Sequence, residues 1–253
     1  MTGSTHYRRF VIVGTARTGS TLLVNLLNAH SQVLAFGELF RSPEGIGWDV
    51  RPFLNYESAK LLALYRADPQ RFLHTSVFRR WPQSYAAVGF KLFYYHARDA
   101  PYSVIWEYLA QNLDTHILHI KRRNILEQYL SLKLAHDTEV WSITEPAERE
   151  PMPICLNIED CRKHFQWVRS LENDCETFFA RHKVKDIYYE DLALDSDAEM
   201  ASVEKFLGLN KEKLNTRMVR QRTLPLSHAI ANYHELMRAF AKTEWADFFD
   251  AVA

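Results

Sequence analysis

The chain has 253 residues, 47% of them hydrophobic, and a formal net charge of zero because 31 Lys and Arg balance 31 Asp and Glu. A chain of this length buries roughly 75% of the surface that its unfolded form exposes, which excludes disordered, collagen-like and disulfide-stapled classes. The zero net charge removes any whole-molecule attraction to nucleic acid or to an acidic membrane. An anion, if bound, therefore needs a local site.

The ends, the apolar runs and the cysteines predict one soluble, cytoplasmic domain over residues 1–253. The apolar run at residues 10–13 is too short for a signal peptide, and no stretch reaches the roughly 18 apolar residues of a membrane span. Cys155, Cys161 and Cys175 fit no zinc spacing and indicate reduced thiols. The oligomeric state stays open at this stage, a homodimer included.

Short β-rich runs alternate with longer helical patterns along the first half of the chain. This alternation of strand and helix is typical of a parallel sheet with crossover helices. The predicted elements are, in chain order, strand 10–13, helix 20–29, strand 87–94, helix 102–111, strand 115–120 and helix 124–135.

The second half continues the same pattern after an acidic, Pro-bounded surface loop at residues 145–151. It predicts a helix over 157–183, a strand over 186–189, a helix over 198–207 that ends at Gly208, and helical segments 226–240 and 244–248. We expect the helical C-terminal part, residues 210–253, to cover one edge of the sheet. The predicted fold class is a P-loop-type three-layer α/β/α architecture with a central parallel sheet.

The loop between Gly14 and Gly19 is the most informative segment, because a buried-type strand precedes it and a helix follows it. The glycines permit a tight turn, the backbone amides form a nest, and the helix N-terminus adds positive partial charge. The four-residue separation is that of nucleotide-triphosphatase loops. However, Ser20 replaces the required lysine, and Arg17 is the cation inside the loop. The site suits a single phosphoryl or phosphosulfate group better than ATP with magnesium.

A second anion site is predicted where strand 115–120 ends in Lys121, Arg122 and Arg123. Ligands of open α/β sheets bind at the carboxyl ends of the strands. Ser131 lies eight residues after Arg123, about two helical turns along the next helix. Two anion sites on one sheet match the requirement for a nucleotide that carries a 5′-phosphosulfate and a 3′-phosphate.

At these positions the sequence resembles the sulfotransferases that use 3′-phosphoadenosine 5′-phosphosulfate (PAPS). Within that family it looks most like small bacterial enzymes that sulfate carbohydrates or lipid-linked sugars. The segments that carry the resemblance are the loop 17–22, the element 123–131, Tyr-Glu-Asp-Leu at 189–192, Phe-Leu-Gly-Leu at 206–209 and the segment 225–233.

The resemblance implies that PAPS is the co-substrate, that 3′-phosphoadenosine 5′-phosphate (PAP) is the product, and that no metal is required. The acceptor it implies is a small molecule or a glycan. It assigns Arg123 and Ser131 to the 3′-phosphate; Arg123 is preferred to Arg122 because the eight-residue offset to Ser131 is then kept. The residues it assigns to the 5′-phosphosulfate are Arg17, Thr18, Gly19, Ser20 and Thr21.

Sulfuryl transfer needs a base for the acceptor hydroxyl and positive charge near the departing phosphate oxygen. The resemblance implies Glu38 as the base, since related enzymes place a glutamate at a similar point after the first helix. Lys91 is a charged residue in an apolar strand, which is costly unless it meets an anion. His96 closely follows that strand and is the alternative base.

Two other functions stay open on the sequence alone. The first is a P-loop kinase that uses ATP and magnesium on a small hydroxyl compound, against which the missing loop lysine counts. The second is a module that binds PAP and transfers nothing.

Overall fold

The computed structural model describes residues 4–48, 58–141, 152–214 and 225–249. The chain forms two compact units, the first made of Met1–Lys121 and Asp174–Thr216, the second of Arg122–Asn173 and Arg217–Ala253. Each unit has its own hydrophobic cluster. The predicted surface loop at 145–151 lies outside the described residues.

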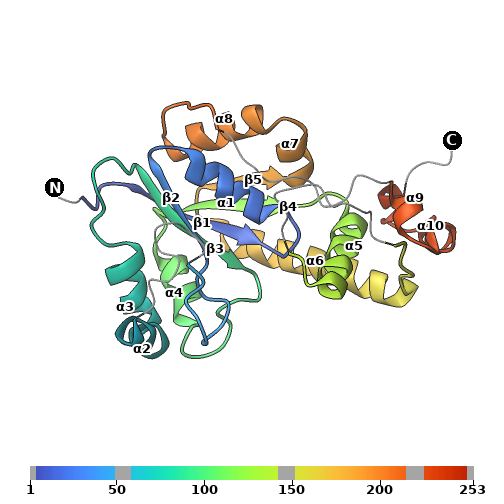
Figure 1. Ribbon diagram of the computed structural model, residues 1–253, viewed down its shortest axis with the longest axis horizontal. Helices are drawn as coiled ribbons and strands as arrows, with labels where there is room; N and C mark the ends of the chain where they lie inside the picture. Colours follow the sequence, from blue (N-terminus) through green and yellow to red (C-terminus); the bar gives the residue numbers. More distant parts are fainter. Residues whose placement is uncertain (1–3, 49–57, 142–151, 215–224, 250–253) are drawn as a thin grey trace. The chain divides into compact units, whose positions relative to one another are not determined.

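The first unit is built on a five-stranded parallel sheet in the order β2-β3-β1-β4-β5 (Figure 1). Because β1 is central, the chain moves to one side of it for β2 and β3 and to the other side for β4 and β5. The loop after β1 therefore lies at the topological switch point, where ligands of such sheets bind. The strands are β1 Arg8–Gly14, β2 Val33–Glu38, β3 Ala87–Phe93, β4 His116–Lys121 and β5 Val184–Tyr188.

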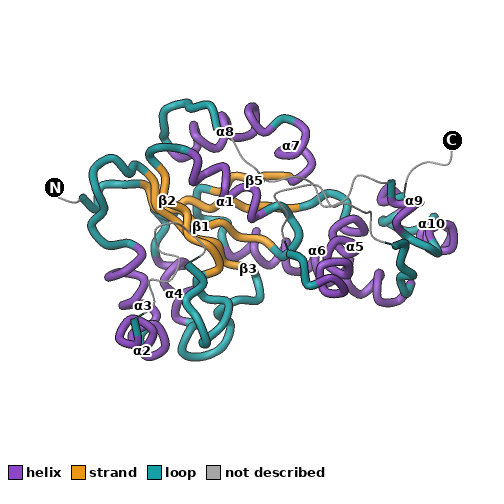
Figure 2. The backbone as a smooth tube through the Cα atoms, viewed as in Figure 1, coloured by secondary structure: helices purple, strands orange, loops and turns teal. Residues whose placement is uncertain are grey.

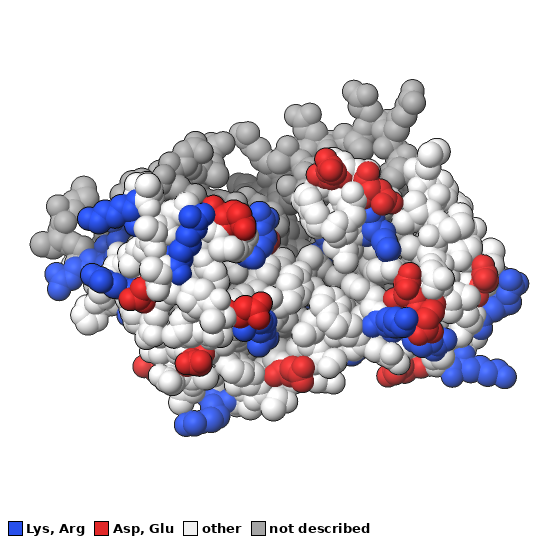
Figure 3. All heavy atoms as spheres, turned by 90° about the horizontal axis from the view of Figure 1, so that it is seen from below, with Lys and Arg blue, Asp and Glu red and all other residues white. Residues whose placement is uncertain are grey.

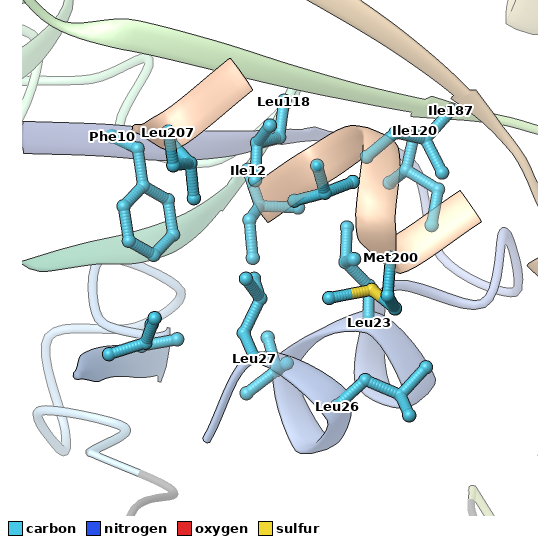
Figure 4. Close-up of a cluster of buried hydrophobic side chains, with 14 of the residues drawn as sticks. Phe10, Ile12, Leu23, Leu26, Leu27, Leu118, Ile120, Ile187, Met200 and Leu207 are labelled. Atoms are coloured by element: carbon cyan, nitrogen blue, oxygen red, sulfur yellow. The ribbon is translucent and has the colours of Figure 1, made fainter. Parts of the chain in front are cut away.

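Helices cover both faces of this sheet, with α1, α7 and α8 on one face and α4 on the other (Figure 1). The α1 face buries an apolar cluster that joins Ile12 of β1, Leu23 of α1 and Met200 of α8 (Figure 4). This confirms the predicted three-layer α/β/α fold. The helices of the unit are α1 Ser20–Ala29, α2 Ala59–Ala67, α3 Pro69–Phe72, a π-helical turn Leu73–Val77, α4 Val104–Gln111, α7 Tyr189–Leu194 and α8 Ser196–Leu207.

The second unit is helical, with a core in which Phe165 contacts the rings of Phe240, Trp245 and Phe248. Asn124 caps its first helix by accepting a hydrogen bond from the Glu127 amide at 3.0 Å. Its elements are α5 Ile125–Thr138, the greater part of α6 Ile158–Phe178, α9 Leu226–Ala229, α10 Tyr233–Phe240 and a 3-10 turn Ala246–Phe248.

The prediction of one helix over residues 226–240 is wrong, because the chain turns extended at Ile230 and divides the segment into α9 and α10. There Ile154 donates its amide to the Ala229 carbonyl at 3.1 Å, and its own carbonyl accepts from the Ala231 amide at 2.9 Å. Pairing with a distant segment thus outweighs a helical pattern. The segment 244–248 is likewise a short 3-10 turn.

Elsewhere the predicted elements are present, including helix 20–29 and the end of α8 at Gly208, which adopts the left-handed φ of 70°. Helix α6 ends at Phe178 rather than at 183, and Tyr189 begins α7 instead of ending the strand. Strand β2 and the helices α2, α3 and α7 were not predicted. The three cysteines are free thiols. Among the described helices, none has the length and apolar composition needed to cross a bilayer. Figure 3 shows acidic and basic side chains interspersed over the described part of one face.

Candidate active site

The loop between β1 and α1, seen as teal tube in Figure 2, has glycines where larger residues would not fit. A Cβ on Gly14 would lie 2.6 Å from the Ile120 carbonyl oxygen of the neighbouring strand. Gly19 has a φ of +81°, and a Cβ there would lie 2.4 Å from the Tyr189 ring. Both glycines are therefore dictated by close packing, and Gly19 also by the left-handed turn that opens α1.

The interior of this loop is held by its own polar side chains. The Thr18 hydroxyl is buried and donates to the Thr15 carbonyl at 2.8 Å. Ser20, the first residue of α1, is also buried, whereas Arg17 is half-buried and has a φ of 67°. The first turn of α1 holds no acidic residue, so its N-terminus keeps the positive partial charge that suits an anion.

The segment that follows β3 braces the loop from the neighbouring strand. The Tyr94 amide donates to the Gly14 carbonyl at 3.0 Å, and the Ala16 amide donates to the Tyr95 hydroxyl at 3.2 Å. Sequence reasoning missed both tyrosines. The feature of the sequence that could have pointed to these tyrosines is their position directly after the strand that carries Lys91. The Tyr95 hydroxyl thus accepts a hydrogen bond from one of the backbone amides of the loop.

Glu38 and Lys91 meet because strand β2 contains a bulge. Phe36 pairs with Phe90, but the register then shifts so that Glu38, rather than Gly37, lies opposite Lys91. A bulge re-aims the side chain that follows it. The result is an ion pair of 2.9 Å between Glu38 Oε1 and Lys91 Nζ, in which the lysine side chain is almost fully buried.

Lys91 also connects this pair to the phosphate loop. Its Nζ donates to the Thr21 hydroxyl, in the first turn of α1, at 3.3 Å. The prediction that Lys91 needs an anionic partner is therefore confirmed, with Glu38 as that partner. A buried ammonium shared between a carboxylate and the loop places positive charge beside the anion nest.

His96 is the third member of this cluster and is held as a neutral ring. Its Nδ1 accepts the Phe93 amide at 3.4 Å, so the ring proton belongs on Nε2, which lies 4.0 Å from Glu38 Oε2. Burial lowers the pKa of His96 to about 4, with further lowering from Lys91 and Arg41, against the opposing effect of Glu38. At neutral pH this histidine presents an N–H to the carboxylate rather than a basic nitrogen.

The basic residues after β4 divide between buried and exposed positions. Arg122 is buried and forms an ion pair with Glu127 of α5. Arg123 is exposed, and its carbonyl accepts a hydrogen bond from Arg169 at 3.4 Å. Ser131 is half-buried on α5. These residues belong to the second unit, whereas the loop, Glu38, Lys91 and His96 belong to the first.

A second polar network on β4 and β5 was also missed. The His119 ring lies between the Tyr94 hydroxyl at 2.5 Å and Asp186 at 3.3 Å, and Lys121 contacts Asp186 at 2.8 Å and Glu176 at 3.0 Å. Hydrogen bonds from His119 and Lys121 hold the pKa of Asp186 well below its usual range. Lys121 supplies the positive charge that balances both carboxylates.

These features define an α/β protein whose glycine loop, of the kind that binds anions, lies at the switch point of its sheet beside a carboxylate and a lysine. Comparison with known proteins gives the particular family. The model of the sulfotransferase family matches residues 9–213, and this chain therefore belongs to that family.

Relatives and a solved structure agree with this assignment. Nodulation protein H of Rhizobium tropici is 31% identical over 95% of this chain and 92% of its own length. Nodulation protein H of Rhizobium meliloti is 29% identical over 96% of this chain and 95% of its own length. A sulfotransferase from Alicyclobacillus acidocaldarius shares the fold with a TM-score of 0.51 at 18% identity, covering 93% of this chain and 91% of that one. The protein is a sulfotransferase, which moves a sulfuryl group from a sulfate donor to a small-molecule or glycan acceptor.

Proposed function

We propose that this sulfotransferase takes its sulfuryl group from PAPS and transfers it to a hydroxyl of a carbohydrate or glycolipid. The observation that carries the proposal is the contact of Lys91 with both Glu38 and Thr21. It joins a carboxylate to the anion-binding loop through one buried cation. Such an arrangement serves the two ends of a sulfuryl transfer, where a proton leaves one oxygen and negative charge develops on another.

Glu38 is the proposed base. Its Oε1 is engaged by Lys91, while Oε2 lies 4.0 Å from His96 Nε2, beyond hydrogen-bond range. Oε2 can therefore accept the proton of an acceptor hydroxyl. In the proposed step the hydroxyl oxygen attacks sulfur in line, its proton passes to Glu38, and the bond from sulfur to the 5′-phosphate oxygen breaks to release PAP.

His96 lies near that carboxylate but is not the proposed base. A base at this point would need a nitrogen lone pair facing the acceptor, but the Phe93 amide occupies Nδ1 and the proton occupies Nε2. The backbone around it is also tied, since its carbonyl accepts from the Trp106 indole at 2.8 Å. This geometry favours Glu38 over the alternative that the sequence left open.

Lys91 stabilises the charge that develops on the departing oxygen. It reaches the first turn of α1 through Thr21 and is nearly fully buried. A buried ammonium interacts with developing charge far more strongly than one in water. Because Glu38 becomes neutral when it takes the acceptor proton, Lys91 can then interact with the leaving oxygen without leaving an unpaired carboxylate behind.

The donor is proposed to lie with its 5′-phosphosulfate on the loop formed by Arg17, Thr18, Gly19, Ser20 and Thr21. Its 3′-phosphate is assigned to Arg123 and Ser131. The contrast between the two arginines supports this choice, since Arg122 is buried against Glu127 while Arg123 is exposed. When bound, PAPS supplies an activated sulfuryl group on a good leaving group.

Calorimetry with PAP, ADP and ATP, with and without magnesium, tests the donor. We expect magnesium-independent binding of PAP that is much tighter than binding of ADP and is lost in Arg123→Ala. Arg162→Ala is the matched control, because Arg162 is a cation of the same unit that pairs with Glu159. A preference for ATP with magnesium would instead support the kinase. PAP binding without transfer of labelled sulfate to any carbohydrate or glycolipid would support the silent module.

A further inference from the structure

The second unit holds a pocket of about 470 Å³ that the proposed transfer chemistry does not use. It is a shallow depression that is wide open to solvent, so a ligand would lie against its surface rather than be enclosed. Helices α5 and α6 supply all of its lining. The lining residues are Tyr129, Lys133, Asp160, Lys163, His164 and Trp167.

Three rings form a row along this pocket. The Tyr129 and His164 centroids lie 4.5 Å apart, those of His164 and Trp167 lie 5.6 Å apart, and Trp167 is 43% exposed. The middle ring of the row is anchored, because His164 Nε2 donates a hydrogen bond to Oε1 of the buried Gln128 side chain at 2.6 Å. The three rings are tilted to one another, and the Trp167 indole at the end of the row is exposed beside the anchored His164 ring. A ring of this size is usually mostly buried.

The rim of the pocket is polar and carries both donors and an acceptor. The Lys133 ammonium lies 5.4 Å from the Tyr129 ring centroid. Lys163 and Asp160 are exposed on the α6 side. A ligand matched to this site has one flat, weakly apolar face and hydroxyl groups around its edge. A pyranose ring has that chemistry, since its axial C–H groups form an apolar face and its equatorial hydroxyls point outward.

Helix geometry separates this pocket from the residue assigned to the 3′-phosphate. Tyr129 and Lys133 are four positions apart and so share one face of α5. Ser131 lies between them, about 200° around the helix from Tyr129. The pocket and Ser131 thus occupy opposite faces of one helix, and a sugar in the pocket would not displace the donor.

We propose that this pocket binds a pyranose ring of an oligosaccharide, stacked on Trp167 with its hydroxyls on Lys133, Lys163 and Asp160. The inference extends the carbohydrate acceptor of the proposed function and rests on it for its role in catalysis. The binding itself requires no donor. A second sugar-binding point would hold an extended acceptor while another of its residues reacts.

The test is a titration of the full chain, labelled with ¹⁵N, by cellotetraose, N-acetylchitotetraose and maltotetraose, with adenosine as a fourth probe. We expect the Trp167 indole signal to shift with at least one saccharide. Trp167→Ala should weaken that binding at least tenfold, whereas Trp167→Phe, which keeps an aromatic face, should stay within about threefold. Trp141→Ala is the matched control, because Trp141 is 50% exposed in the same unit and lies outside the pocket lining.

Three results would overturn the proposal: no shift of the Trp167 indole with any saccharide, binding that Trp167→Ala leaves unchanged, or a preference for adenosine at this site. The outcome is separate from that of the transfer reaction. Saccharide binding that depends on Trp167, in a protein that sulfates nothing, would overturn the proposed function and leave this site in place. Sulfate transfer without such binding would remove only the site.

Discussion

Two clusters on opposite sides of β1 each bring a strand carboxylate, a lysine and a histidine together, but the carboxylates are held differently. Both clusters lie in the first unit, on or just after neighbouring parallel strands. The cluster on β2 and β3, with the turn after it, is Glu38, Lys91 and His96, and the cluster on β4 and β5 is Asp186, Lys121 and His119.

The difference lies in how many bonds each carboxylate already makes. Asp186 is contacted by both His119 and Lys121, and Lys121 is shared further with Glu176. Among the residues that the structure describes, Lys91 makes the one close contact with the Glu38 carboxylate, whose second oxygen lies beyond hydrogen-bond range of His96. Asp186 receives both of these contacts on Oδ1 and is 48% exposed, whereas Glu38 is 18% exposed and shares its lysine with the loop after β1. We therefore propose that Asp186 braces the fold and that Glu38 takes the proton, a distinction that residue composition alone does not reveal.

Replacing the two carboxylates should give the largest difference in kcat between the two clusters. We expect Glu38→Gln to lower kcat by about 10²–10⁴-fold with PAP affinity unchanged, because the amide cannot accept the acceptor proton. Asp186→Asn should leave kcat within a few-fold while lowering the melting temperature. Labelled-PAPS turnover, PAP calorimetry and thermal unfolding measure the three quantities. Retained turnover in Glu38→Gln would exclude it as the base.

Replacing the lysines should also lower kcat in the Glu38 cluster and not in the Asp186 cluster, but by a smaller factor than replacing the carboxylates. Lys91→Met should lower kcat by about 10²–10³-fold, the cost of removing one charge-stabilising donor. Lys121→Met should mainly destabilise, because it leaves Asp186 and Glu176 without their shared cation. Steady-state kinetics and urea unfolding on both variants decide this. Equal losses of kcat would contradict the distinction between the clusters.

The buried histidine beside Glu38 and Lys91, His96, predicts a pH dependence of stability. Its pKa is about 4 in the folded protein against 6.5 when unfolded, so the unfolded state binds a proton first as the pH falls. Stability is then lost as the pH drops below 6.5, by about 2 kcal/mol at pH 5, and the loss levels off only below pH 4. Urea unfolding of wild type and His96→Gln at pH 7.5 and pH 5 measures this, and a pH dependence equal in both would refute it.

The smallest effect is expected from the Tyr94 hydroxyl, which contacts His119, while the Tyr94 backbone amide contacts the loop. Tyr94→Phe removes the hydrogen bond to His119 but keeps the backbone bond to Gly14. We expect a loss of about 1 kcal/mol in unfolding free energy and little change in kcat. Urea denaturation and turnover, compared with wild type, check both. A large loss of turnover would mean that the His119 network also shapes the active site.

The alternation of strands and helices, the Gly14 to Gly19 loop and the first helix could all be predicted from the sequence. Their signals are local, since glycine spacing and apolar periodicity act over a few residues. Lys91 could be singled out for the same reason, because a charge inside an apolar strand needs a partner wherever the strand lies.

Tertiary structure alone decided which carboxylate meets that lysine and what the histidine does. The bulge in β2 that brings Glu38 opposite Lys91 depends on pairing with β3, some fifty residues away in the chain. The tautomer of His96 depends on the Phe93 amide and on burial by the folded core. The break between α9 and α10 depends on a bridge to Ile154. A sequence pattern carries local preference, while register, burial and hydrogen-bond partners are set by segments that meet only in the folded chain.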